Sequence, residues 1–121
     1  MELPAIPSSA RTARRFVGDA LASFGVGGGD LAETAVLLTS ELVTNAVLYT
    51  GGTIEVAVQR ADGAVVVSVG DSSTVSPQPR RPGPEDPSGR GLGLVEALSE
   101  AWGVEQPSSE GKAVWFLLRD R

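Results

Sequence analysis

The 121-residue sequence predicts an α+β fold, in which helices and an antiparallel or mixed sheet form two layers. Two segments with apolar residues at helical spacing come first along the chain. Two segments of alternating apolar and polar residues follow and meet at an Asp-Gly turn. A third helical segment and a second pair of strands complete the chain. Helices and strands therefore occur in blocks, unlike the regular strand–helix alternation that predicts a parallel sheet.

The first helix is expected from Ser8 or Ser9, either of which can cap it, to about Phe24. Its apolar residues recur at steps of three and four, which makes one buried stripe. The glycine-rich segment 25–29 ends the helix. Prolines at positions 4 and 7 interrupt the residues before it, so we expect the first seven residues to be extended or loose.

The second helix is expected from Asp30 to about Leu48. Asp30 suits the N-cap position, and Glu33 three residues later completes a capping-box pattern. Glycines at positions 51 and 52 end the helix. Because its residues are apolar nearly all round, we expect this helix to be largely buried.

The strands are predicted from alternation and from turn residues. Residues 53–59 alternate, and Asp62-Gly63 is a hairpin signal before the returning strand 64–69. The segment 72–88 is rich in Pro, Ser, Gly and Arg and has no period, and a loop of this length in a compact domain is usually functional or disordered. The remaining expected elements are a helix over 91–102 and two strands over 104–106 and 112–118, joined by a turn at 108–111.

Composition excludes several classes of function. With 41% hydrophobic residues the chain can form one core, and we expect a single domain over 1–121. The absence of cysteine excludes disulfides and thiolate metal sites, and the absence of histidine removes the commonest metal ligand and general base. The net charge of −5 argues against direct nucleic-acid binding. No apolar run approaches the ~20 residues of a membrane span and no signal peptide is visible, so we expect a cytoplasmic protein without a membrane partner.

Two polar residues stand out in the second helix. Glu41 and Asn45 are four residues apart and therefore share a face, in a helix where a carboxylate is costly without a partner or a task. The side-chain oxygen of Asn45 could hold Mg²⁺ together with phosphates and waters, and Glu41 could accept a proton from a hydroxyl or a water. The alternative is a solvated polar stripe, which is also our interpretation of the arginines at positions 11, 14 and 15.

Two further patterns lie at the ends of predicted elements. Asp71 ends a strand, where it could accept a hydrogen bond from an adenine amino group, although an aspartate at such a place commonly serves the turn. Gly89, Gly91 and Gly93 alternate just before a helix. Glycine allows close backbone approach, and free N–H groups at a helix N-terminus bind phosphate. No Gly-Lys-Ser/Thr follows, so this is not a Walker A loop.

In this order and spacing, the patterns resemble the GHKL superfamily of ATP-binding proteins. Residues 40–47 (SELVTNAV) are similar to its N box, residues 70–73 (GDSS) to its first glycine box and residues 89–94 (GRGLGL) to its second. Residues 102–103 and 111–115 resemble the closing segments of small actinobacterial anti-sigma-factor kinases. The resemblance covers nearly the whole chain. It implies a Bergerat-type fold, a two-layer α/β sandwich with a mixed, mostly antiparallel sheet covered by three helices.

The resemblance also implies a role for each matched residue. Glu41 would be the general base, Asn45 would coordinate Mg²⁺ and Asp71 would select adenine. The other implied nucleotide contacts, beneath an ATP lid over about 72–88, are Ser73, Gly89, Arg90, Gly91, Leu92, Gly93 and Lys112. The sequence departs from the family pattern at Ser73 and Val75, which occupy glycine positions of the first box.

By this resemblance, the expected function is that of an ATP-binding regulatory protein. It would be a serine/threonine protein kinase and anti-sigma factor that uses ATP and Mg²⁺ to phosphorylate a small antagonist protein of anti-anti-sigma type. A sigma factor and a second copy of the chain are further partners that the resemblance suggests. Two alternatives stay open. One is a non-catalytic module whose protein binding depends on nucleotide, and the other is a kinase domain that phosphorylates a histidine of another chain.

Overall fold

The computed structural model describes the backbone of residues 1–49, 52–71, 87–108 and 111–119, and their side chains except at 49, 87–91 and 106–108. Its elements follow the order β1, α1, α2, β2, β3, α3, β4, β5. The helices are α1 (Ser9–Ser23), α2 (Gly29–Tyr49) and α3 (Pro87–Leu98), and the strands are β1 (Glu2–Leu3), β2 (Ile54–Ala61), β3 (Ala64–Asp71), β4 (Ala101–Ser108) and β5 (Gly111–Arg119).

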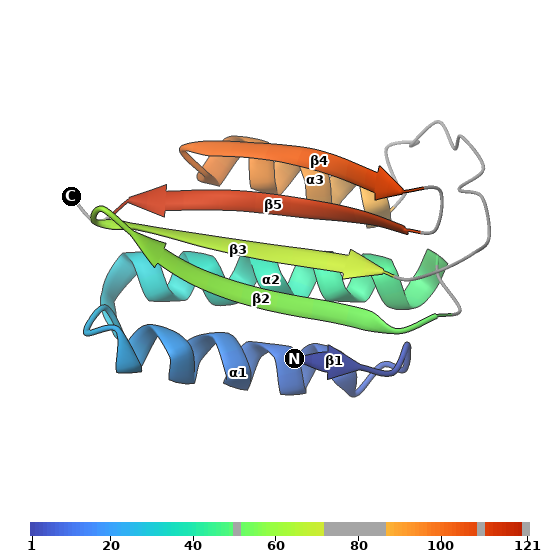
Figure 1. The fold of residues 1–121 in the computed structure, drawn as a ribbon, viewed down its shortest axis with the longest axis horizontal. Coiled ribbons are helices and arrows are strands. Elements are labelled where there is room, and N and C mark those ends of the chain that lie inside the picture. Colours follow the sequence, from blue (N-terminus) through green and yellow to red (C-terminus); the bar gives the residue numbers. More distant parts are fainter. Residues whose placement is uncertain (50–51, 72–86, 109–110, 120–121) are drawn as a thin grey trace.

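The strands form one sheet in the order β1-β2-β3-β5-β4, and each described neighbouring pair is antiparallel. Figure 1 shows the helices together on one face of this sheet, while no helix of the described residues covers the other face. We call this second face, onto which Val66, Ser68 and Trp115 project, the open face. The predicted two-layer α+β fold with three covering helices is therefore confirmed.

Alternation along the central strands directs one set of side chains into the core. Val65, Val67 and Val69 of β3 are buried beneath the helices, as are Phe116 and Leu118 of β5. The first two helices contribute the buried residues Ala13, Val17, Leu21, Ala35, Leu38, Leu42 and Val43. Full burial of one such large apolar side chain contributes about 1.5–3 kcal/mol. This layer holds α2 against the middle of the sheet, and so determines where the polar side chains of α2 lie.

The Asp-Gly hairpin is confirmed in position and in backbone conformation. Asp62 and Gly63 have φ angles of 50° and 76°, and Ala61 pairs with Ala64 on either side of them. Positive φ at both turn residues matches the twist of the strands that the turn joins. The turn thereby sets the register of β2 against β3 as far as Asp71.

The third helix differs from its prediction. It occupies Pro87–Leu98 instead of 91–102, so its first residues belong to the segment expected to be a lid. Proline suits the first helical position, and Leu92 and Val95 pack in the core, which outweighs the penalty of glycines in a helix. Trp102 continues the helical spacing by chance and lies in β4. The rest of the expected lid, 72–86, lies outside the described residues.

The start of α1 also differs in detail. Ser8 occupies the N-cap position but makes no capping bond with its side chain. Ser9 is buried, and its Oγ donates a hydrogen bond of 2.6 Å to the carbonyl oxygen of Pro4. Ser9 therefore ties the segment after β1 to the beginning of α1 instead of capping the helix.

The α2 helix is less buried than its composition predicts, because Leu37 and Leu48 are exposed. By length and composition alone, residues Gly29–Leu48 would suffice for a membrane span, with a mean hydropathy of 1.3. This differs from the expectation that no segment approaches such a span. The core helix of a globular protein meets the same test, and α2 packs against α1, α3 and the sheet.

Candidate functional site

Four elements with predicted site residues meet at one end of the fold. In Figure 1 the C-terminal end of α2, the end of β3 and the starts of α3 and β5 all lie on the right-hand side. The α2 helix packs against α3, β3 and β5, so this grouping follows from the core described above. Residues from four separate parts of the chain are thereby brought to one region of the molecule.

Glu41 and Asn45 lie one helical turn apart in the C-terminal half of α2. Both are half-buried, and residues four apart on one helix face have Cβ atoms about 5–6 Å from each other. The Oδ1 atom of Asn45 is buried and has no hydrogen-bond partner in the part of the chain that the structure describes. A buried acceptor without a partner costs about 1–3 kcal/mol, so the fold tolerates this amide at some expense in stability.

Thr39, in the same helix, shows how a buried polar side chain is ordinarily accommodated. It is fully buried, and its Oγ1 donates a hydrogen bond of 2.7 Å to the carbonyl oxygen of Ala35. The Oδ1 atom of Asn45 has no comparable bond among the described residues. An unpaired buried oxygen of this kind needs an explanation, and an oxygen available to an external cation or donor provides one.

Asp71 and Lys112 stand directly opposite each other where β3 ends and β5 begins. Asp71 alternates in phase with the buried Val67 and Val69, which places its side chain on the helix-covered face of the sheet. Asp71 is half-buried and Lys112 is exposed. A Cβ atom on Gly70 would lie 3.3 Å from the carbonyl oxygen of Lys112, so the two strands approach closely here. Both predicted residues therefore lie at the ends of the two neighbouring strands that border this region.

The alternating glycines at 89, 91 and 93 form the first turns of α3 instead of preceding the helix. A methyl group added to Gly93 would have no atom of the described residues within 4 Å. Packing therefore does not require glycine at this position, although glycine inside a helix costs about 1 kcal/mol against alanine. Leu92, by contrast, is half-buried and packs against the core. Two predicted contacts lie outside the described part of the chain, namely Ser73 and the side chain of Arg90.

One contact beside this region was not predicted. Arg14 of α1 donates a hydrogen bond of 2.9 Å from Nη1 to the Oγ of Ser40, the residue before Glu41. The arginine is exposed, as expected for a solvated face, but it also links α1 to α2 next to the candidate base. Nothing in the local sequence indicated this contact, because the two residues meet only when the helices pack.

Comparisons with known proteins show the family to which the chain belongs. The family model described as "Histidine kinase-like ATPase domain" matches residues 3–118, which is nearly the whole chain. The chain belongs to this family. The predicted resemblance to the GHKL superfamily, whose members bind ATP, is therefore confirmed.

Solved structures also resemble this ATPase domain, with 27 matching chains. One of them is the crystal structure of the RsbU and RsbW domains of Rv1364c from Mycobacterium tuberculosis, at 26% sequence identity and a TM-score of 0.69. The match covers 98% of this chain and 32% of that chain. The present chain therefore spans about a third of the length of that relative. No curated protein matches.

The described residues fit the ligands that a histidine kinase-like ATPase implies. The buried, unpaired Oδ1 of Asn45 is an oxygen ligand of the kind that Mg²⁺ prefers. Within the described residues, no group of three or more carboxylate, cysteine or histidine side chains could hold a metal. A metal in this region would therefore need ligands besides side chains of these types, such as the amide oxygen of Asn45 and the oxygens of a phosphate. Glu41, one turn away, places a carboxylate beside it.

Proposed function

We propose that this histidine kinase-like ATPase binds ATP with Mg²⁺ and acts as a serine/threonine protein kinase and anti-sigma factor. Its phosphate acceptor would be a small antagonist protein of anti-anti-sigma type. The main support is the buried Oδ1 of Asn45, one turn after Glu41, which has no hydrogen-bond partner among the described residues. The similarity to a chain that contains an RsbW domain supports the choice of a protein acceptor.

Each side of the site has a separate task in this proposal. Asn45 coordinates Mg²⁺, and the ion neutralises charge on the phosphates when bound. Asp71, at the end of β3, accepts a hydrogen bond from the adenine amino group. The backbone of Gly89, Gly91 and Gly93 approaches the phosphates, where side chains would prevent close contact. Further nucleotide contacts come from Ser73, Arg90, Leu92 and Lys112.

Glu41 acts on the acceptor protein. Its carboxylate takes the proton of the acceptor hydroxyl as the hydroxyl oxygen forms a bond to the γ-phosphorus and the bond to the departing ADP oxygen breaks. General-base assistance of this kind typically contributes 10²–10⁴-fold in rate. Positioning and charge stabilisation supply the rest of the acceleration in phosphoryl transfer.

The partners and location follow from the same proposal. The protein acts in the cytoplasm, where ATP is available, as one ATP-binding domain over 1–121. It binds the antagonist protein, and a sigma factor is the second partner. A homodimer is a further expectation; β1 consists only of Glu2–Leu3, so an edge-to-edge dimer would have a short strand at its centre.

The proposal is tested by transfer of the γ-phosphate from radiolabelled ATP to a panel of candidate antagonist proteins. We expect acid-stable phosphate on a serine or threonine of one of them. Glu41→Gln should lower the transfer rate by at least about 100-fold while the protein still binds Mg-ATP. Glu33→Gln is the matched control, because Glu33 is an exposed carboxylate in the first part of the same helix.

Three outcomes would contradict the proposal in different ways. Acid-labile phosphate would indicate a histidine acceptor. Absence of transfer with intact Mg-ATP binding would favour the nucleotide-dependent binding module, which the serine and valine at glycine positions 73 and 75 also favour. Equal loss of transfer in Glu33→Gln would show that the charge of α2, and not a base at position 41, matters.

A further inference from the structure

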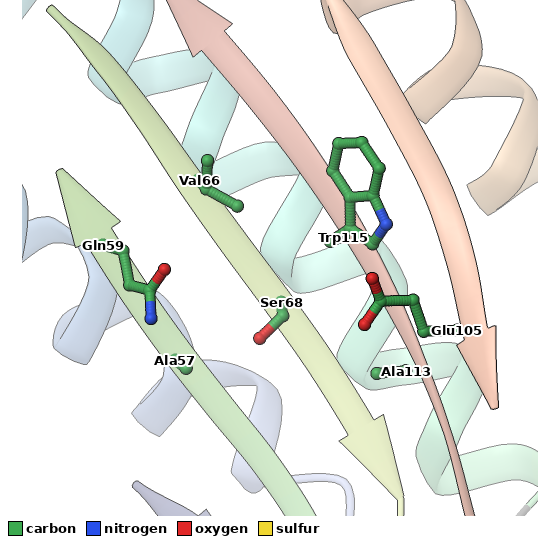
Figure 2. Close-up of a pocket in the computed structure, with 7 residues that line it drawn as sticks. All are labelled: Ala57, Gln59, Val66, Ser68, Glu105, Ala113 and Trp115. Carbon is green, nitrogen blue, oxygen red and sulfur yellow. The ribbon is translucent and has the colours of Figure 1, made fainter. Parts of the chain in front are cut away.

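The open face of the sheet has a hollow that the proposed ATP site does not use. It lies on the opposite side of the sheet from α2 and has a cavity volume of about 310 Å³. Figure 2 looks onto it, with the helices behind the strands. The lining residues come from β2, β3, β5 and β4 and are Ala57, Gln59, Val66, Ser68, Glu105, Ala113 and Trp115.

The indole of Trp115 forms one side of this hollow. Trp115 pairs with Gly103 of β4, and a Cβ atom on Gly103 would lie 2.8 Å from Nε1 and 2.9 Å from both Cε2 and Cζ2 of the ring. The indole therefore lies over the glycine, and any larger residue at 103 would displace it. Figure 2 shows the ring nearly face-on from the open side. One ring face thus rests on the sheet, and the other is available as a flat aromatic surface.

Polar groups surround this surface without partners of their own. Gln59, Ser68 and Glu105 border the hollow, and none of them makes a side-chain hydrogen bond or ion pair within the described residues; neither does the Nε1–H of Trp115. In Figure 2 the carboxylate of Glu105 lies beside the indole, with Ser68 between it and Gln59. A charged carboxylate therefore lies next to the aromatic ring, and Ser68 and Gln59 extend the polar lining of the hollow toward β2.

This combination selects for a planar cation. A guanidinium group stacks on indole, donates two parallel hydrogen bonds to a carboxylate and keeps further N–H groups for a neighbouring hydroxyl or for water. An anion would meet Glu105, and also Glu55, which belongs to the same row of paired residues across β2, β3, β5 and β4. No lysine or arginine is among the described residues that line the hollow. The charge of the site is thus complementary to a cation.

The shape of the site indicates the source of that cation. Sites for small molecules usually enclose most of the ligand surface, whereas this hollow lies on a sheet face that no helix of the described residues covers. A side chain presented by a protein needs only such a shallow recess. We propose that the open-face hollow binds an arginine side chain of a partner protein, with the guanidinium stacked on Trp115 and paired with Glu105. This inference is independent of the proposed kinase activity.

The test is an NMR titration of the ¹⁵N-labelled full chain with the peptide Ac-Gly-Ala-Arg-Ala-Gly-NH₂. The chain has two tryptophans, and Trp115→Phe identifies which indole N–H signal belongs to Trp115. We expect saturable shifts of that signal and of the Glu105 amide, and little change at Trp102. The same peptide with citrulline in place of arginine keeps the shape but removes the charge. Its binding should be about fivefold weaker, the factor that one exposed charge pair contributes.

Matched variants separate the local site from the general acidity of the face. Glu105→Gln should remove the preference for arginine over citrulline. Glu55→Gln removes the same charge from the same row outside the hollow and should keep the preference. Three results would overturn the proposal. They are equal binding of both peptides, an unchanged preference in Glu105→Gln, and absence of shifts at about 10 mM arginine peptide, which is about ten times a dissociation constant of 1 mM. A Trp115 signal that shifts with protein concentration alone would also overturn it, because a second copy of the chain would then cover the face.

Discussion

Replacing Asn45 by leucine should stabilise the protein without ligand and at the same time abolish its response to Mg-ATP. The Oδ1 atom of Asn45 is buried without a partner among the described residues, a situation that costs about 1–3 kcal/mol. Leucine has the same branching and the same number of side-chain heavy atoms as asparagine but no polar atom, so Asn45→Leu should recover about 1–2 kcal/mol. The unfolding entropy of about 2.1 cal/mol/K per residue amounts to about 0.25 kcal/mol/K for this chain. The melting temperature should therefore rise by about 4–8 °C.

The second half of this prediction concerns the ligand. Mg-ATP at about 100 times its dissociation constant should stabilise the original protein by about 2.7 kcal/mol, or roughly 10 °C. In Asn45→Leu this increment should be absent, because the proposed metal ligand is missing. Thermal melts of both proteins with ATP alone, Mg²⁺ alone and Mg-ATP measure the two effects in one experiment.

Thr39→Val is the matched control, since Thr39 is a buried polar residue of the same helix with a satisfied hydroxyl. It should lower the unfolding free energy by at most about 1 kcal/mol and leave the Mg-ATP increment unchanged. If Asn45→Leu lowered the melting temperature, the unpaired oxygen would not be a source of strain in the unliganded fold. If the Asn45→Leu protein were still stabilised by Mg-ATP to the same extent, Asn45 would not hold the metal.

Three further predictions concern other parts of the fold. Gly103→Ala should lower the unfolding free energy, measured in urea, by about 1–3 kcal/mol, because the new methyl group would meet the Trp115 ring. In a Trp115→Leu background the same substitution should cost much less, and fully additive free-energy changes of the two substitutions would refute the contact. Gly93→Ala should raise the stability of the unliganded protein by about 0.5–1 kcal/mol, since no described atom lies near the added methyl group. It should also weaken Mg-ATP binding measured by calorimetry, and an unchanged affinity would show that this glycine does not contact the phosphates. Glu100→Gln should change stability by less than about 1 kcal/mol, because its ion pair with Arg119 (3.1 Å) is solvent-exposed, and a larger loss in urea unfolding would contradict this interpretation.

Sequence patterns were most informative where local chemistry decides the structure. The Asp62-Gly63 turn was predicted correctly because positive φ at both positions is a property of those two residues. The third helix begins and ends about one turn earlier than predicted, because Pro87 suits the first helical position and the packing of Leu92 and Val95 outweighs the helix penalty of the glycines. Local propensity is a weak term when tertiary burial opposes it.

In the candidate site, too, features set by local sequence could be predicted and features set by tertiary packing could not. The four-residue spacing of Glu41 and Asn45 is enough to predict that both lie on one helix face, because that spacing is close to one helical turn. The unpaired state of the Asn45 oxygen could not be predicted, since it depends on which atoms from other elements reach it. The contact between Arg14 and Ser40 and the hollow around Trp115 also escaped prediction, because each joins residues that are distant in sequence.

The sequence by itself determined the order of the elements, the hairpin turn, the family and the residues that match its nucleotide-binding motifs. Periodicity, turn chemistry and motif spacing are one-dimensional properties, so they can be read along the chain. The tertiary structure alone decided which face of the sheet the helices cover, which residues meet across strands and, within the described residues, which polar atoms lack partners. Those features arise from side-chain packing and strand register, where a shift of one residue would move every side chain to the opposite face.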